Sequence, residues 1–135
     1  MTAIQELVGG LYAALMRGDG AELRALLAPG FTAELPAGMP LGAGGSRAGA
    51  EEMIRDTWRR LSRAYAMRVE PEEWIPCADG RLLVLGRYRG EARSTGREVD
   101  AAFAHLWSAA GGRLTALWHV TDTAVWAAAL EEAPA

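Results

Sequence analysis

The sequence predicts an α+β fold in one domain, residues 1–135, with a curved antiparallel sheet wrapped around helices. Two observations carry this prediction. Apolar residues recur at helical spacing in the first half of the chain, and strand-like alternation with short turns dominates the second half. Helices followed by a strand meander are typical of α+β domains, in which one sheet face is buried against the helices.

The N-terminal segment predicts a helical hairpin. Thr2 and Gln5 form a capping box for an amphipathic helix that continues to Gly18. Asp19 can cap a second, short helix, which the Pro-Gly pair at 29–30 stops.

The middle of the chain predicts a strand, a loop and a third helix. Alternating apolar residues mark a short strand at 31–35, and residues 36–49 are too rich in Gly and Pro for regular structure. A loop of this length often covers a site, so we expect it to act as a lid. Helical spacing returns over 50–65, with four arginines on the solvated side.

Four stretches in the second half have strand character. Their approximate bounds are 67–76, 81–93, 97–109 and 113–121, with turn signals at Asp79-Gly80, Ser94 to Gly96 and Gly111-Gly112. We expect the last three strands to form consecutive hairpins. A short helix over 123–133, capped by Asp122 or Thr121, then closes the domain before Pro134.

The only two histidines, His105 and His119, lie on two apolar strands joined by a Gly-Gly turn. Side chains alternate faces along a strand, so the register decides whether the imidazoles share a face. A two-residue turn would pair His105 with Trp118 and separate the histidines. We favour a three-residue turn, which leaves both imidazoles on one face with a diagonal separation of about 7 to 8 Å. The pairs expected from it are Phe103 with His119 and His105 with Leu117.

The strand that carries the first histidine has two apolar faces. Phe103, His105 and Trp107 share the face that we expect to meet the helices, and Leu106 belongs to the other. An apolar outer face needs a cover, and a second copy of the chain in a C2 dimer is the simplest one. Trp118 belongs by parity to this outer face and is expected at the interface.

The inner face predicts a pocket with acid-base capacity, because histidine is the side chain whose ordinary pKa lies nearest neutral pH. His119 is the candidate acid or base, and His105 is the candidate group that assists it or orients the substrate. The side chains expected to line the substrate pocket are Tyr12, Met53, Trp58, Tyr65, Phe103, Trp107 and Leu117. The competing interpretation is that both histidines are core residues hydrogen-bonded to their neighbours.

Composition argues against several classes of function. The net charge of −3 offers no basic excess for nucleic acid, and no apolar run is long enough to span a membrane. All 14 basic residues are Arg, which removes lysine Schiff-base chemistry. Cys77 has no partner for a disulfide, and a metal would need Asp122 as third ligand, so we expect no metal and no cofactor. We expect a cytoplasmic protein, and the Ala, Gly and Arg bias suggests a bacterial source.

Several segments together resemble the SnoaL-like branch of the nuclear transport factor 2-like superfamily, which also contains the ketosteroid isomerases. The resemblance rests on GDGAELRALLAP, PLGAGGSRAGAEEM, FAHLWSAAGGRL and DTAVWAAAL and covers nearly the whole chain. It implies a cone-shaped, cystatin-like α+β barrel with an internal pocket, and a homodimer formed through the outer sheet face. The activities that it implies are those of polyketide cyclases, isomerases, dehydratases and epoxide hydrolases, alongside proteins without catalysis.

The resemblance extends to individual residues. SnoaL-type cyclases use a His on the penultimate strand and an Asp fourteen residues later, and His105 and His119 have this spacing, with an imidazole in place of the acid. The general base and the oxyanion donors of the steroid isomerases correspond to Leu35, Leu11 and Ala104, so that machinery is not expected.

We therefore expect a cofactor-independent enzyme of bacterial natural-product biosynthesis. It would cyclise, isomerise or dehydrate a polyketide-like or other lipophilic oxygenated small molecule. The alternatives are a non-catalytic binding protein or accessory dimer for a lipophilic ligand, and an enzyme with epoxide hydrolase-type chemistry.

Overall fold

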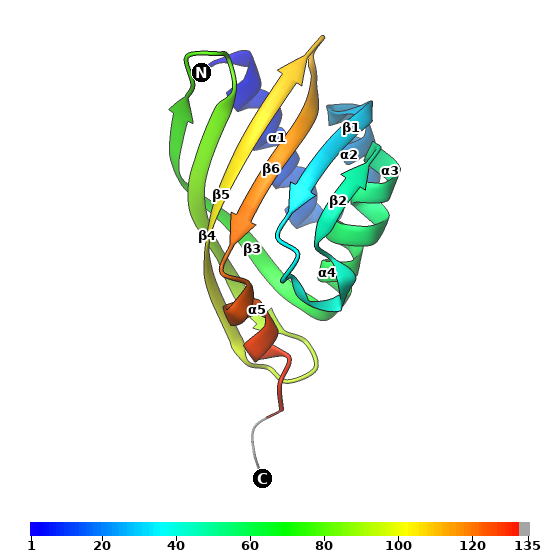
Figure 1. Ribbon diagram of the computed structural model, residues 1–135, viewed down its shortest axis with the longest axis vertical. Coiled ribbons are helices and arrows are strands. Elements are labelled where there is room, and N and C mark those ends of the chain that lie inside the picture. Colours follow the sequence, from blue (N-terminus) through cyan, green and yellow to red (C-terminus); the bar gives the residue numbers. More distant parts are fainter. Residues whose placement is uncertain (133–135) are drawn as a thin grey trace.

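The computed structural model describes residues 1–132 and has the predicted α+β architecture, with one six-stranded curved sheet and helices on its inner face (Figure 1). The strand order is β2-β1-β6-β5-β4-β3, and every neighbouring pair is antiparallel except β1 with β6. The helical segments are α1 (Ala3–Arg17), α2 (Gly20–Leu26), η1 (Pro40–Gly42), α3 (Ala50–Met53), η2 (Ile54–Arg59), α4 (Arg60–Ala64) and α5 (Thr123–Ala129). The strands are β1 (Leu27–Leu35), β2 (Gly45–Ala48), β3 (Tyr65–Pro76), β4 (Leu82–Ala92), β5 (Glu98–Ala110) and β6 (Arg113–Thr121).

Helix α1 begins and ends at its predicted caps. The Thr2 hydroxyl accepts a hydrogen bond from the backbone N–H of Gln5, and the Gln5 side chain accepts one from the N–H of Thr2. Gly18 ends the helix in the left-handed conformation, with φ of 68°. The helix packs across the inner face of the sheet, which buries Tyr12 there.

The expectation of an irregular loop over 36–49 is wrong in part. Residues 40–42 form a short 3₁₀ turn, and β2 pairs with β1 at the edge of the sheet. The segment is also tied to the third helix, because Arg47 donates to the Thr57 hydroxyl and that hydroxyl donates to the carbonyl of Ala43. The second of these bonds satisfies a backbone carbonyl that an open Gly-rich loop would leave to water.

The expected helix over 50–65 is present as α3, η2 and α4 in succession. Its middle part, η2, has the wider π-helical pattern of hydrogen bonds, which often accompanies functional sites. Strand β3 follows α4 directly at Tyr65 and forms the edge of the sheet opposite β2.

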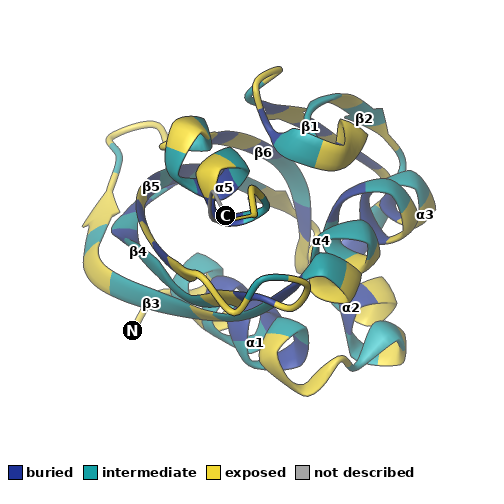
Figure 2. Ribbon diagram, turned by 90° about the horizontal axis from the view of Figure 1, so that it is seen from below, coloured by how far each residue is buried: buried dark blue, intermediate teal, exposed yellow. Residues whose placement is uncertain are grey.

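Strands β3 to β6 form a meander that bends around the interior, as seen from below in Figure 2. Two glycines of β4 allow the close approach of β3, because a Cβ at Gly86 or Gly90 would collide with the carbonyl oxygen of Glu70 or Ala66. The pairing of β3 with β4 also shifts by one residue after Pro71.

The hairpin of β5 and β6 differs from the predicted one. Its turn holds two residues, Gly111 and Gly112, both with positive φ. Just beyond the turn the pairing shifts by one residue, and Thr115 of β6 has no partner in the register. The turn and this bulge together set His105 directly opposite His119.

The predicted register is therefore wrong, although both imidazoles do share a face. The predicted cross-strand pairs were Phe103 with His119 and His105 with Leu117. The observed pairs are Phe103 with Thr121, His105 with His119 and Trp107 with Leu117. A two-residue turn alone would have separated the imidazoles, and the extra residue in β6 returns them to the same side.

Helix α5 is shorter than expected and ends at Ala129. Asp122 stands at its N-cap, but the side chain makes no capping hydrogen bond. The Trp126 ring packs edge-on against Tyr65, with 4.9 Å between ring centroids, and so holds the helix against the sheet. The expected end of this helix and tail, at residues 133–134, lies outside the described residues.

The inner face of the sheet is buried and the outer face is not. Along β5 the predicted inner residues Phe103, His105 and Trp107 are buried, whereas Trp118 and Val120 of β6 are exposed on the outer face. Within residues 1–132, no helix combines the length and the apolar character needed to cross a membrane.

Candidate functional site

A cavity of about 400 Å³ lies between the inner face of the sheet and helices α1, α4 and α5. Aliphatic and aromatic side chains form most of its wall, and its volume suits a small organic molecule. The aromatic side chains in the wall that also carry a polar group are Tyr12, Trp58, Tyr65, Tyr88, His105, Trp107, His119 and Trp126.

His105 and His119 lie side by side in this wall. The two residues are 4% and 5% exposed, and their ring centroids are 4.5 Å apart, with the ring planes inclined by 77°. Phe103 stacks on the His105 ring at 4.0 Å between centroids. Direct pairing across two strands, and this stacking, hold both imidazoles in place.

The hydroxyl group of Tyr88 bridges the two histidines. Its oxygen lies 2.7 Å from Nε2 of His105 and 3.1 Å from Nε2 of His119. Phe103 and Trp126 pack against the phenol ring, at 4.8 and 5.0 Å between centroids. One hydroxyl therefore couples two imidazoles that stand on different strands.

The other side of His105 is bound to helix α1. Its Nδ1 lies 2.8 Å from the hydroxyl oxygen of Tyr12, and that oxygen accepts a hydrogen bond of 3.2 Å from the indole N–H of Trp107. The result is one continuous hydrogen-bonded chain, in the order Trp107, Tyr12, His105, Tyr88, His119.

Burial keeps the ionisable side chains of this hydrogen-bonded chain neutral near pH 7. It lowers the pKa of His119 from 6.5 to about 4, and burial with the nearby His119 lowers the pKa of His105 well below its ordinary value. Burial also raises the pKa of Tyr12 and Tyr88 well above that of a free phenol. A proton can move through such a site more readily than a net charge can reside in it.

At the His119 end, the hydrogen-bonded chain stops at an atom without a partner. Nδ1 of His119 is buried and has no hydrogen-bond partner. A buried polar nitrogen without a partner costs about 1 to 3 kcal/mol, and such groups often mark functional positions.

The structure brings most of the predicted site residues to the cavity. Those in its wall, besides the two histidines, are Tyr12, Trp58, Tyr65, Trp107 and Leu117. Phe103 and Met53 are not among the residues that line it. Phe103 is the stacking partner of His105, and Met53 is fully buried in the main hydrophobic core.

Tyr88 and Trp126 also line the cavity, although neither belongs to the predicted set of pocket residues. A parity argument could have found Tyr88, because it shares a strand face with Val84, which pairs with His105. Trp126 could not be found in this way, since its place depends on how α5 folds back onto the sheet.

Charge around the cavity is one-sided. No carboxylate occurs among the described wall residues, and the charged side chains there are Arg17 and Arg93.

The expectation that residues 36–49 act as a lid is wrong for the described structure, because no residue of that segment lines the cavity. The segment is held instead at the β1 edge of the sheet.

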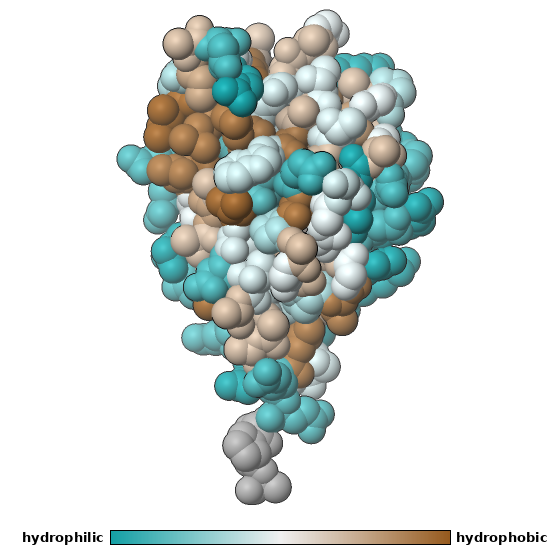
Figure 3. Space-filling model, viewed as in Figure 1, coloured by the Kyte–Doolittle hydropathy of each residue, from teal (hydrophilic) through white to brown (hydrophobic). Residues whose placement is uncertain are grey.

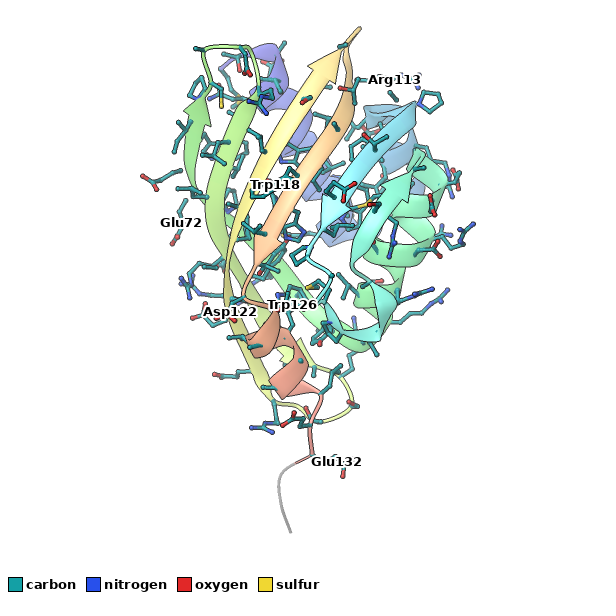
Figure 4. The ribbon with its side chains drawn as sticks, viewed as in Figure 1. Glu72, Arg113, Trp118, Asp122, Trp126 and Glu132 are labelled. Carbon is teal, nitrogen blue, oxygen red and sulfur yellow. The ribbon has the colours of Figure 1, made fainter. Side chains whose placement is uncertain are left out.

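A metal centre has no support in the described part of the chain. No cluster of three or more His, Cys, Asp or Glu side chains that could hold an ion occurs within residues 1–132. Asp122, the third ligand that the sequence offered, stands at the start of α5 (Figure 4).

The comparisons with known proteins agree with this architecture. The model of the family described as SnoaL-like domain matches residues 8–117. An NTF2-like protein of unknown function from Burkholderia pseudomallei K96243 is 32% identical, with a TM-score of 0.85 over 96% of this chain and 98% of that chain. No curated protein matches the chain.

Two further solved structures share the fold at lower identity. TerC, co-crystallised with polyporic acid, is 23% identical, with a TM-score of 0.83 over 95% of this chain and 98% of that chain. Wild-type IdmH from Streptomyces antibioticus, described as a candidate polyketide cyclase, is 22% identical, with a TM-score of 0.79 over 93% and 96%.

Proposed function

The chain belongs to the family of SnoaL-like domains, and on that premise we propose that it is a cofactor-independent enzyme of small-molecule metabolism. It performs acid-base chemistry, such as cyclisation, isomerisation or dehydration, on a lipophilic oxygenated molecule of the polyketide kind. The observation that carries the proposal is the His105–Tyr88–His119 cluster in the wall of a largely apolar cavity.

The geometry supports His119 as the group that exchanges a proton with the substrate and His105 as the group that assists it. His119 has a free ring nitrogen, whereas both nitrogens of His105 are bound to tyrosine hydroxyls. Proton transfer by a positioned side chain contributes about 10² to 10⁴ in rate.

The cavity wall supports a flat, apolar substrate with oxygen functions. Trp58, Trp107 and Trp126 offer aromatic surface for stacking, and the tyrosines and histidines offer hydrogen bonds. TerC was co-crystallised with polyporic acid, and IdmH is described as a candidate polyketide cyclase; both share the fold of this chain, which supports the proposed class of ligand.

The experiment uses 2-tetralone, an apolar bicyclic ketone whose α-hydrogens exchange with D₂O through the enol. We expect the wild-type protein to accelerate this exchange, followed by ¹H NMR, and His119→Gln to lose about 10²-fold or more of the acceleration with a nearly unchanged Tm. Thr32→Val removes an exposed hydroxyl of β1 and serves as the control. Wild-type acceleration in a His105→Gln/His119→Gln double variant would refute the catalytic proposal.

A non-catalytic binding protein is the second candidate. The low pKa of His119, about 4, favours it, because an imidazole of such weak basicity can serve as a fixed hydrogen-bonding group. Thermal stabilisation by 2-tetralone without any exchange, and with the compound recovered unchanged by mass spectrometry, would support this function over the first. Epoxide hydrolase-type chemistry has less support, since the described cavity wall offers no carboxylate.

The outer sheet face supports the expected homodimer. Apolar pairs run across four strands there, as Ile75 with Leu83, Leu83 with Leu106 and Leu106 with Trp118. Figure 3 shows hydrophobic atoms gathered on this face, and Figure 4 shows Trp118 on the viewer's side of β6. We propose that two copies pack these faces together, in the bacterial cytoplasm that the composition suggests.

A further inference from the structure

We propose that Tyr12, His105, Tyr88 and His119 form a neutral proton relay, oriented by the indole N–H of Trp107, that moves a proton between two positions of one ligand. The proposal deepens the proposed function and rests on it, because the ligand is the oxygenated molecule in the same cavity. The reaction class of such a transfer is keto-enol tautomerisation.

One fixed donor sets the direction of the relay. The indole N–H of Trp107 can only donate, so the Tyr12 oxygen accepts that bond and the Tyr12 proton is free to point at Nδ1 of His105. A neutral His105 that accepts at Nδ1 carries its proton on Nε2 and donates it to Tyr88. The Tyr88 proton then points at Nε2 of His119, which leaves the proton of His119 on Nδ1.

The opposite direction satisfies fewer groups. If His119 carried its proton on Nε2, the three bonds between His119 and Tyr12 would reverse and His105 would donate to Tyr12, while the indole N–H of Trp107 would still donate to the same oxygen. The Tyr12 proton would then lack a partner, and the lone pair of Nδ1 in His119 would lack one as well. The first direction leaves only the N–H of His119 unpaired, so it is the resting state.

Tyr12 and His119, the residues at the two ends of the relay, both contribute to the cavity wall, and Nδ1 of His119 is itself buried in that wall. A ligand X–H bond at the Tyr12 end breaks and its proton joins the Tyr12 oxygen, while the Tyr12 proton passes to His105. The Nε2 proton of His105 passes to Tyr88, the Tyr88 proton passes to His119, and the Nδ1 proton of His119 forms a new bond to the ligand. Each group loses one proton and gains one, so no atom of the protein acquires a charge.

The relay is compatible with the burial of its four groups in neutral form. Burial disfavours an imidazolium or a phenolate, whereas a concerted transfer through neutral groups creates neither. After transfer the relay points the opposite way, and it is reset when water returns a proton to Nδ1 of His119 and Tyr12 gives one up.

The first test reads the tautomers directly. The chain has only two histidines, so ¹⁵N-histidine NMR near pH 7 yields four ring nitrogens, and His105→Gln assigns them. We expect protons on Nε2 of His105 and on Nδ1 of His119. A Trp107→Phe variant removes the fixed donor and should give mixed tautomers. A proton on Nε2 of His119 in the wild type, or wild-type tautomers in Trp107→Phe, would overturn the relay.

The second test breaks the relay at its middle. Tyr88→Phe should lose the single tautomer of His119 and about 10²-fold of the acceleration of 2-tetralone exchange, with Thr32→Val as control. Wild-type exchange in a folded Tyr88→Phe variant would overturn the relay while leaving the proposed acid-base function intact. If the wild type accelerates no exchange, the proposed function fails, and the tautomer spectra alone decide the orientation of the hydrogen-bonded chain.

Discussion

Tyr88 and His119 meet across an intervening strand: the Tyr88 hydroxyl on β4 lies 3.1 Å from Nε2 of His119 on β6, with β5 between them. The intervening strand β5 contributes His105, which is bound to the same hydroxyl. Curvature of the sheet brings inner-face side chains of β4 and β6 closer than they would be on a flat sheet. The site is thus a property of the bent sheet as much as of its residues.

Stability should fall as the pH decreases from about 7 to about 4, because the unfolded chain binds protons at both histidines near pH 6.5 and the folded chain does not. The lowered pKa of His119, about 4, corresponds to a contribution on the order of 3 kcal/mol that is fully present above the unfolded pKa and lost toward pH 4. Urea unfolding at several pH values measures it. A His105→Gln/His119→Gln variant should lose most of this slope, and an equal slope would contradict the assignment.

Tyr65→Phe should destabilise the fold without breaking the relay. The buried Tyr65 hydroxyl donates to the carbonyl of Trp126 at 2.7 Å, and phenylalanine at this position removes that buried hydrogen bond. We expect a loss of about 1 to 3 kcal/mol in the free energy of unfolding, measured by urea denaturation. Thr32→Val should cost far less. If both variants were equally stable, α5 would not depend on this bond.

Met53→Ala should act on the core alone. Met53 is fully buried and lies outside the cavity wall, so its truncation should cost about 2 to 5 kcal/mol. The affinity for 2-tetralone, measured by NMR titration below the melting temperature, should remain that of the wild type. A marked change in affinity with little loss of stability would return Met53 to the pocket.

Trp118→Glu should convert the proposed dimer into a monomer. Trp118 is 51% exposed on the outer face and stands at the end of the apolar row, where a carboxylate would have to be desolvated in the interface. Light scattering after size-exclusion chromatography measures the mass, and Trp118→Phe is the matched apolar control. A wild-type protein that is monomeric at high concentration would exclude this interface.

Local pattern was enough for the elements and for the faces of the strands. The capping box at Thr2 and the left-handed Gly18 bound α1, and alternation along β5 places His105 and Trp107 inward. These features depend on neighbours within a few residues, so the sequence by itself determined the α+β class and the inner position of the histidines.

Tertiary structure alone decided how the site is assembled. The unpaired Thr115 changes the register by one residue, and the alternation of apolar and polar residues along β6 does not predict this bulge. The pairing of β2 with β1, the exclusion of Met53 from the cavity and the reach of Tyr88 to His119 all depend on contacts between segments distant in sequence. Such contacts follow from the bend of the sheet and the packing of helices on it, because side-chain alternation specifies a face but not the neighbour across it.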